Sequence, residues 1–160
     1  WGDFSDVPLA PDDLLLSVRG GTILDFTGLE CQILRFPSLT LGFRPETTFL
    51  YQLKADNMAP RHKKGACCVF EPPFGGLKDF DIALMRIDDL LTVRRLYQIP
   101  GGGWELRCSN GLYPPIILGV EGSQILEFCL GRLLLYDEVP TDISKLPKKV
   151  IQDRKRPFAI

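Results

Sequence analysis

The stretch KADNMAP, Lys54–Pro60, and the stretch TVRRL, Thr92–Leu96, decide how this sequence of 160 residues is interpreted. Taken alone, the first is a turn, because Asp56 and Asn57 are residue types whose side chains bond to nearby backbone groups and because proline fixes the local conformation. Taken alone, the second is a strand that carries solvated arginines. Whether the two stretches form one site depends on the fold of the rest of the chain.

Prolines and glycines, 13 and 15 of them, divide the rest of the chain into short apolar runs. Runs of this length that are bounded by turn residues are typical of strands. The runs are TILDF (22–26), CQILRF (31–36), FLYQLKA (49–55), CCVF (67–70), IALMRI (82–87), LTVRRLYQI (91–99), WELRC (104–108), PIIL (115–118) and QILEFCLGRLLLY (124–136). The sequence therefore predicts a mostly β fold.

Turn and helix signals complete the local prediction. Alternation of side chains is clearest over Leu91–Ile99, and the glycines of Gly101–Trp104 predict a hairpin turn after that strand. Pro11–Asp13 is a helix-starting pattern that predicts a short turn over Leu14–Leu16, and Phe43–Thr48 predicts another around its proline. Few short helices are expected.

The charge balance excludes a general electrostatic role. With 19 Lys and Arg against 20 Asp and Glu, no global basic field favours nucleic acid or an anionic membrane. The longest apolar stretches, such as 116–120 and 133–136, are far shorter than the roughly 20 residues of a spanning helix. The chain starts at Trp1 without a targeting segment. We expect a fragment of a longer cytoplasmic, bacterial protein that does not contact a membrane.

The five cysteines and the single histidine, His62, do not form a metal-ligand pattern. No C-x-x-C pair occurs, and the cysteines lie among apolar residues, which favours buried free thiols in a reducing compartment. Gly-rich phosphate-binding loops are also absent from the sequence. We therefore expect no cofactor and no metal.

Six stretches follow one another in a diagnostic order: ADNMAP (55–60), KKGACCVF (63–70), DFDIALMRI (79–87), DDLLTVRRL (88–96), CSNGLYPPIIL (108–118) and CLGRLLLY (129–136). In this order they resemble the C-terminal domain of LexA, UmuD and the lambdoid phage repressors, which are self-cleaving serine peptidases related in fold to signal peptidase. The family motifs are G-D-S-M-E-P, D-G-D-x-V, G-D-I-V-x-V-R, E-V-T-V-K-R-L, D-N-x-x-Y-P-P-I and a closing G-x-V strand. The resemblance implies a LexA-like fold of short, strongly bent strands.

The resemblance also divides the chain. It covers about residues 43–136, so we expect a LexA-like domain there, preceded by an N-terminal segment, 1–42, of strands or an arm. Residues 137–160 carry a basic surplus and are expected to form a solvated tail.

The resemblance assigns the catalytic dyad to two residues that lack the required chemistry. In the family a serine attacks a peptide carbonyl, and a neutral lysine accepts the serine proton. Asn57 stands at the serine position and Arg94 at the lysine position. An amide nitrogen is a very poor nucleophile, because its lone pair is delocalised into the carbonyl. A guanidinium remains protonated in proteins and cannot act as the base.

Other groups offer little compensation. Ser109, Ser123, His62 and Asp56 are the candidates for a replacement triad, but the sequence supplies no third residue that would orient His62, which we expect to be an exposed turn residue. Family members usually cut themselves at Ala-Gly or Cys-Gly, and neither dipeptide occurs here. Gly20-Gly21 lies roughly where the resemblance would put the cleavage segment.

Three functions follow as hypotheses. The first is a catalytically inactive, self-associating domain of a phage-type or SOS-type repressor, with DNA bound by an N-terminal helix-turn-helix outside this chain and dimer contacts over Gln124–Tyr136. The second is an active self-cleaving peptidase with atypical residues. The third is a module whose cleft holds a peptide or an antirepressor. A recombinase filament is a further candidate partner. We expect Asn57 and Arg94 to face each other across the remnant cleft, with the Asn57 side-chain oxygen and the Asp56 carboxylate as acceptors for Arg94, which would then be a structural clamp.

Overall fold

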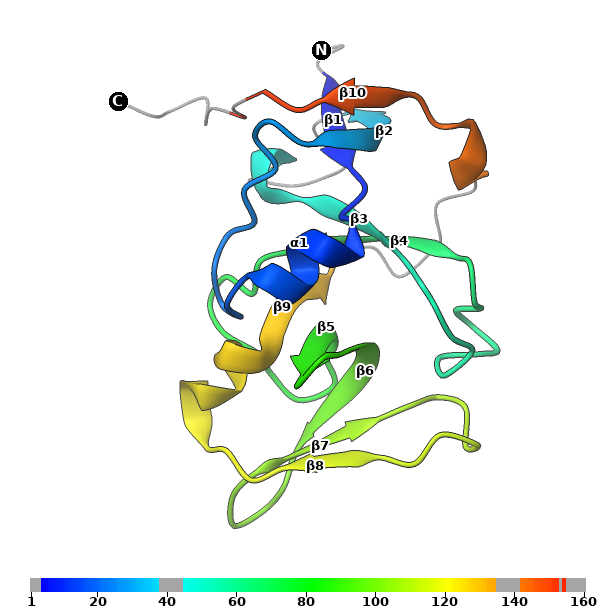
Figure 1. Ribbon diagram of the computed structural model, residues 1–160. Coiled ribbons are helices and arrows are strands. Elements are labelled where there is room, and N and C mark those ends of the chain that lie inside the picture. Colours follow the sequence, from blue (N-terminus) through cyan, green and yellow to red (C-terminus); the bar gives the residue numbers. More distant parts are fainter. Residues whose placement is uncertain (1–3, 38–44, 135–141, 153, 155–160) are drawn as a thin grey trace.

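The computed structural model describes residues 4–37, 45–134, 142–152 and 154, and its main element is an antiparallel sheet of seven strands. In spatial order these are β3 (Phe49–Gln52), β4 (Cys67–Glu71), β9 (Cys129–Leu133), β5 (Ile82–Ile87), β6 (Leu90–Gln98), β7 (Trp104–Arg107) and β8 (Ile116–Leu118) (Figure 1). The sheet bends, so that β7 and β8 lie far from β3 in Figure 1. The predicted mostly β fold is confirmed.

A second, three-stranded sheet joins the two ends of the chain. Strand β2 (Glu30–Pro37) lies between β1 (Phe4–Pro8) and β10 (Lys148–Val150), and both neighbours run antiparallel to it (Figure 1). Ile151 follows β10 and is buried in the core. The expected solvated tail is therefore wrong for residues 148–151, because the open edge of β2 pairs with the backbone there and an apolar side chain fills the interior. Residues 137–141, 153 and 155–160 lie outside the described residues.

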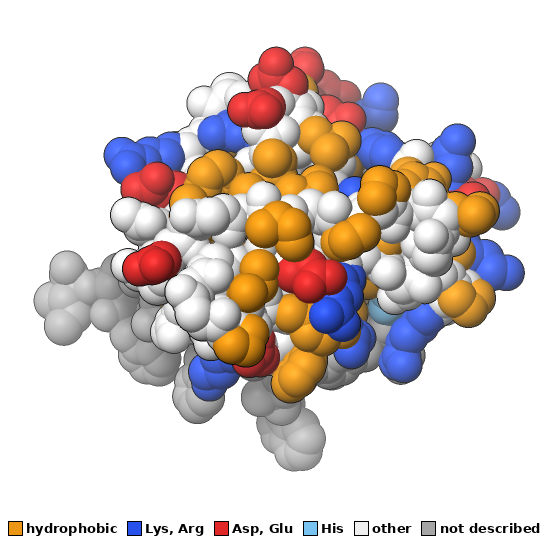
Figure 2. Space-filling view, turned by 90° about the horizontal axis from the view of Figure 1, so that it is seen from below, with side chains coloured by type: hydrophobic (Ala, Val, Ile, Leu, Met, Phe, Trp, Pro, Cys, Tyr) orange, Lys and Arg blue, Asp and Glu red, His pale blue; other side chains and the backbone are white. Residues whose placement is uncertain are grey.

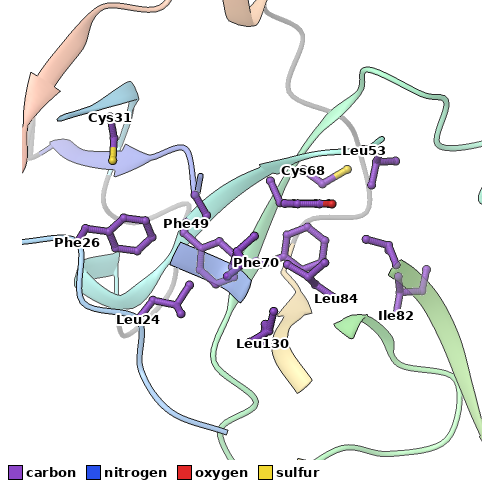
Figure 3. Close-up of a cluster of buried hydrophobic side chains, with 14 of the residues drawn as sticks. Leu24, Phe26, Cys31, Phe49, Leu53, Cys68, Phe70, Ile82, Leu84 and Leu130 are labelled. Carbon is purple, nitrogen blue, oxygen red and sulfur yellow. The ribbon is translucent and has the colours of Figure 1, made fainter. Parts of the chain in front are cut away.

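Buried side chains form clusters on both faces of the large sheet. Along β5, Ile82 and Leu84 belong to one cluster, and Ala83 and Met85 belong to another, as alternation along a strand requires. The first cluster, shown in Figure 3, includes Leu24, Phe26, Cys31, Phe49, Leu53, Cys68, Phe70, Ile82, Leu84 and Leu130. Its members come from the N-terminal segment as well as from the sheet, so residues before position 43 share a core with those after it.

Local predictions are confirmed at the helix and turn signals. The helix α1 (Asp12–Ser17) covers the predicted turn, and the 3-10 helix η2 (Pro45–Thr47) lies within the second predicted helical region. The hairpin turn at Gly101–Gly103 uses positive φ angles of 92°, 125° and 90°, which glycine adopts without a Cβ clash. A further short helix, η4 (Ile143–Lys145), precedes β10.

Two predicted strands are wrong. The run TILDF, 22–26, is an extended loop that buries Leu24 and Phe26, and the Asp25 carboxylate accepts a hydrogen bond from the Thr27 N–H. The first part of 124–136 lies in the 3-10 helix η3 (Gly122–Phe128), which starts with a capping box between Glu121 and Gln124. An apolar run alone does not distinguish these states from a strand.

The expected dimer surface at Gln124–Tyr136 is also wrong for its strand portion. Strand β9 pairs with β4 on one side and with β5 on the other. Cys129, Leu130 and Gly131 are buried. The apolar character of this stretch serves a central strand of the sheet, and residues 135–136 lie outside the described residues.

The described residues lack a membrane-spanning helix and a cluster of metal ligands. No helix in them combines the length and the hydrophobicity needed to cross a membrane. Nor do they contain a group of three or more His, Cys, Asp or Glu residues that could hold a metal ion.

Candidate functional site

The predicted site residues line one cleft between the loop after β3 and the first half of β6. The cleft has a volume of about 210 Å³. Its lining residues are Tyr51, Leu53, Lys54, Ala55, Asn57, Leu90, Leu91, Thr92, Val93, Arg94 and Tyr113. The fold therefore brings together the two stretches that define the sequence interpretation.

Asn57 is held tightly by the strand opposite its loop. Asn57 is only 7% exposed, and its side-chain Nδ2 donates to the backbone oxygen of Val93 at 2.8 Å. The same nitrogen lies 3.6 Å from Cys108 Sγ. The backbone oxygen of Asn57 accepts a hydrogen bond from the backbone N–H of Asn110 at 3.0 Å. Because buried polar groups are costly when unpaired, these bonds fix the loop against β6.

Arg94 is buried beside this loop, and its partners among the described residues are all neutral acceptors. It is 6% exposed; Nε donates to Thr92 Oγ1 at 2.9 Å, and Nη1 lies 2.8 Å from the Pro114 oxygen and 3.4 Å from the Leu106 oxygen. These groups come from β6, β7 and the loop before β8. Arg94 thus links successive parts of the sheet.

The expected contact between Arg94 and the loop is wrong in its details. Among the described residues, Arg94 makes no hydrogen bond to Asn57 or Asp56. The Asn57 nitrogen is turned to the Val93 carbonyl, and Asp56 Oδ1 accepts from the Lys64 N–H at 2.8 Å. The acceptors that the expectation assigned to Arg94 are replaced by backbone carbonyls of the sheet.

The structure does not assemble the replacement triad from Ser109, Ser123, His62 and Asp56. Ser109 Oγ donates to Met58 Sδ at 4.0 Å, and Ser123 is exposed on η3. His62 is 3% exposed, so the expectation of an exposed turn residue is wrong. Its backbone N–H bonds to the Met58 oxygen, which folds the loop inward and carries the imidazole into the interior.

Cys108 is a site residue that the sequence interpretation missed. Of the five cysteines, all free, it alone is not buried. By contrast, burial raises the pKa of the Cys67 thiol and of the Cys129 thiol to about 12. Burial also raises the pKa of Tyr51, on the cleft wall, to about 12. The signal in the sequence is the position of Cys108 between the end of β7 and the turn that starts at Ser109.

The Cys108 thiol has a hydrogen-bond donor, but no base bonds to it within the described residues. Its described hydrogen bond comes from the Asn57 amide. No histidine, lysine or carboxylate among the residues described makes a hydrogen bond with Cys108 Sγ. A nucleophilic thiol needs a base or a cationic neighbour to form the thiolate.

The Gly20-Gly21 segment packs against the backbone at the start of β9. The Gly21 N–H donates to the Cys129 oxygen at 2.8 Å, and a Cβ on Gly20 would lie 2.2 Å from the Glu127 oxygen. Just before this segment, Arg86 Nη1 donates to the carbonyl oxygens of Leu15, Leu16 and Val18 at the end of α1. Neither glycine lines the cleft.

The two dyad positions, Asn57 in the loop after β3 and Arg94 on β6, line one cleft of a bent antiparallel sheet, as the resemblance implies. A family model, Peptidase S24-like, matches residues 17–130. The chain belongs to the Peptidase S24-like family. This is the family of LexA, UmuD and the phage repressors. The S24 match begins at residue 17, within the segment that the sequence interpretation placed before the core. Comparison with curated proteins finds no match.

Proposed function

We propose that this chain is a catalytically inactive S24 domain that serves as the self-associating, regulatory part of a phage-type or SOS-type transcriptional repressor. Binding of DNA is assigned to a helix-turn-helix outside the chain. A helix-turn-helix domain binds its operator more tightly as a dimer, because binding to the second half-site becomes effectively intramolecular. In this proposal the S24 fold is retained for self-association, whereas the self-cleavage reaction of the serine–lysine dyad is lost.

The observation that carries the proposal is the state of the two dyad positions. The Asn57 nitrogen is an amide that donates to the Val93 carbonyl, and amides are very poor nucleophiles. Arg94 donates to three acceptors through its guanidinium, a group that does not serve as a base in proteins. Each tenfold in rate corresponds to about 1.36 kcal/mol of barrier, so losing both members of a dyad removes many orders of magnitude.

The outer edge of β8 supports self-association. This strand ends the seven-stranded sheet, and a free sheet edge is a template for pairing with another chain. Ile117 is 59% exposed and Leu112, in the loop before β8, is 89% exposed. Hydrophobic side chains gather on the face seen from below, beneath β7 and β8 of Figure 1 (Figure 2). This edge takes the place of Gln124–Tyr136 as the proposed dimer contact.

Sedimentation velocity tests the self-association. The wild-type chain is expected to dimerise at micromolar concentration, and Ile117→Lys is expected to shift the equilibrium to monomer, since like charges would meet across a two-fold edge contact. The matched control is Val150→Lys, because Val150 is 54% exposed on the short strand β10 of the other sheet. A wild-type chain that stays monomeric, or equal effects of the two substitutions, contradicts the proposed contact.

Restoring the dyad tests the proposed inactivity. In full-length protein carrying Asn57→Ser and Arg94→Lys, the lost nucleophile and base return at the same positions. Gain of specific self-cleavage in this variant, with an intact wild type, supports the proposal. Cleavage of the wild type at the same rate as the variant contradicts it.

One observation favours the alternative of an active peptidase with atypical residues. Cys108 Sγ lies beside Asn57 and is the one thiol of the five that is not buried. Under that alternative, self-cleavage occurs in the wild type and disappears in Cys108→Ala. Absence of cleavage in both proteins excludes the thiol as a nucleophile for this reaction.

A further inference from the structure

The cleft contains a buried positive charge, Arg94, with which no acidic side chain among the described residues forms an ion pair. Arg94 is 6% exposed, and its described hydrogen bonds go to one hydroxyl and two backbone carbonyls. Within the described part of the chain, its Nη2 atom makes no hydrogen bond and its guanidinium makes no ion pair. A buried charge is costly unless an opposite charge pairs with it. The neutral acceptors orient Arg94, and within the described residues they leave its charge without a paired carboxylate.

The rest of the cleft is mostly apolar. Its apolar lining consists of Tyr51, Leu53, Ala55, Leu90, Leu91, Val93 and Tyr113. Lys54 lies at the rim, where its half-exposed side chain reaches to 3.9 Å from Asp12 Oδ1. A strongly hydrated inorganic anion gains nothing from apolar walls, whereas an anion attached to an apolar group does.

The volume of the cleft limits the size of such a ligand. About 210 Å³ corresponds to the share of roughly seven waters in the liquid, at about 30 Å³ each. Pockets for drug-sized ligands usually span about 300–1,000 Å³. The space therefore suits a molecule of about six to eight non-hydrogen atoms.

We propose that this cleft binds a small carboxylate carried on a short apolar chain, with Arg94 as its counter-ion. The carboxylate would accept from Nη2, and the apolar chain would lie against Leu53 and Leu91. This inference rests on the proposed non-catalytic role of the domain, because it makes Arg94 a binding residue. A ligand at this position contacts the Asn57 loop and β6 together, so it can act as the signal that the repressor senses.

Calorimetric titration of the full-length protein with hexanoate tests the charge requirement. Hexanoate is expected to bind, and hexanamide, of the same size and without charge, is expected to bind at least about tenfold more weakly, since charge-assisted hydrogen bonds are about twice as strong as neutral ones. In Arg94→Gln, hexanoate binding is expected to weaken by at least about tenfold for the same reason.

Arg95→Gln is the matched control. It removes the same charge from the neighbouring residue of β6, whose side chain points to the opposite face of the strand. It is expected to bind hexanoate as the wild type does. Equal weakening in Arg94→Gln and Arg95→Gln would mean that general charge, and not the cleft, attracts the anion, and it overturns the proposal.

A second variant keeps the test valid if Arg94→Gln does not fold. Ala55 is partly exposed on the cleft wall, so Ala55→Asp adds a carboxylate to the cleft without removing a buried group. This internal anion is expected to abolish hexanoate binding. Wild-type affinity in folded Ala55→Asp overturns the proposal.

The remaining outcomes assign the source of the carboxylate and separate the two proposals. An acetylated Ala-Leu dipeptide is titrated as the free acid and as the amide; if the acid binds tightly where hexanoate does not, the ligand is a peptide end and the small-molecule assignment is wrong. If no carboxylate binds at millimolar concentration, the inference is overturned. A gel of the same samples reports self-cleavage, which overturns the proposed inactivity irrespective of the binding result.

Discussion

Substitution of Gly20 by alanine tests whether the segment before the sheet is a docked part of the fold. An alanine Cβ would lie 2.2 Å from the Glu127 oxygen and 2.9 Å from the Leu126 oxygen. Both contacts are with backbone, which cannot rotate away as a flexible side chain does. The adjacent hydrogen bond from the Gly21 N–H to the Cys129 oxygen would have to lengthen as the segment moves.

The expected cost follows from known overpacking effects. Overpacked substitutions usually cost about 1–3 kcal/mol, and a backbone clash of this depth belongs at the upper end, about 3 kcal/mol. For a chain of this size, each kcal/mol lowers the melting temperature by about 2–4 °C. Gly20→Ala is therefore expected to melt about 6–12 °C below the wild type.

Urea denaturation and calorimetry measure this effect, and Gly119→Ala is the control. A Cβ at Gly119 meets nothing within 4 Å, and its backbone does not adopt a positive φ. The control is expected to stay within about 0.5 kcal/mol of the wild type, as most surface substitutions do. If Gly20→Ala is as stable as Gly119→Ala, the segment is not docked on the start of β9. That result would leave Gly20-Gly21 accessible as a cleavage segment.

Three further predictions follow from the site. Iodoacetamide at neutral pH is expected to modify only Cys108 in the folded protein, and mass spectrometry that finds two or more labels without denaturant contradicts the described burial. Asn57→Ala is expected to lower the free energy of unfolding, measured by urea denaturation, by about 1–3 kcal/mol, because the buried Val93 carbonyl loses a hydrogen-bond donor. Asn110→Ala removes an exposed hydrogen bond and is expected to lower it by less. Burial raises the pKa of the Cys67 and Cys129 thiols to about 12 from 9.0, so the folded state keeps protons that the unfolded state releases. Their contribution to stability is complete below pH 9 and is lost as the pH rises toward 12, and a urea midpoint that does not fall over this range counts against their burial.

Strand prediction was reliable where the sequence carries a local signal. The run 91–99 alternates and is followed by three glycines, and it forms β6 with a hairpin turn to β7. The run 22–26 is also apolar, but it forms no strand, while Leu24 and Phe26 fill the core. In both cases the apolar composition predicts burial. It does not predict whether a neighbouring strand is available to pair with the backbone.

Pairing between strands far apart in the chain could not be predicted from the sequence. The basic surplus of 137–160 predicted a solvated tail, yet Lys149 pairs with Cys31 across β10 and β2, and its Nζ lies 2.9 Å from Asp6 Oδ2. Nothing local in the tail indicates that β2 has an open edge. His62 is also buried, and its backbone N–H bonds to Met58 in a loop that the Asn57 side chain attaches to Val93 of β6.

The candidate site was predicted by the order of motifs and corrected by geometry. Asn57 and Arg94 line one cleft, as the resemblance implies. The acceptors of Arg94 were not predictable, since the Leu106 and Pro114 carbonyls belong to backbone whose position depends on the bend of β7 and β8. Every residue has a backbone carbonyl, so the residue types do not indicate which carbonyl will accept a bond from Arg94. Only the fold determines this.

Mass spectrometry of the intact, full-length wild-type protein after incubation at alkaline pH tests the central claim most directly. A self-cleaving member of the S24 family is incubated in parallel, and circular dichroism verifies that both proteins remain folded. If Asn57 and Arg94 cannot supply a nucleophile and a base, the wild type retains a single intact mass while the relative is cut. Two fragments from one specific bond in the wild type would contradict the account.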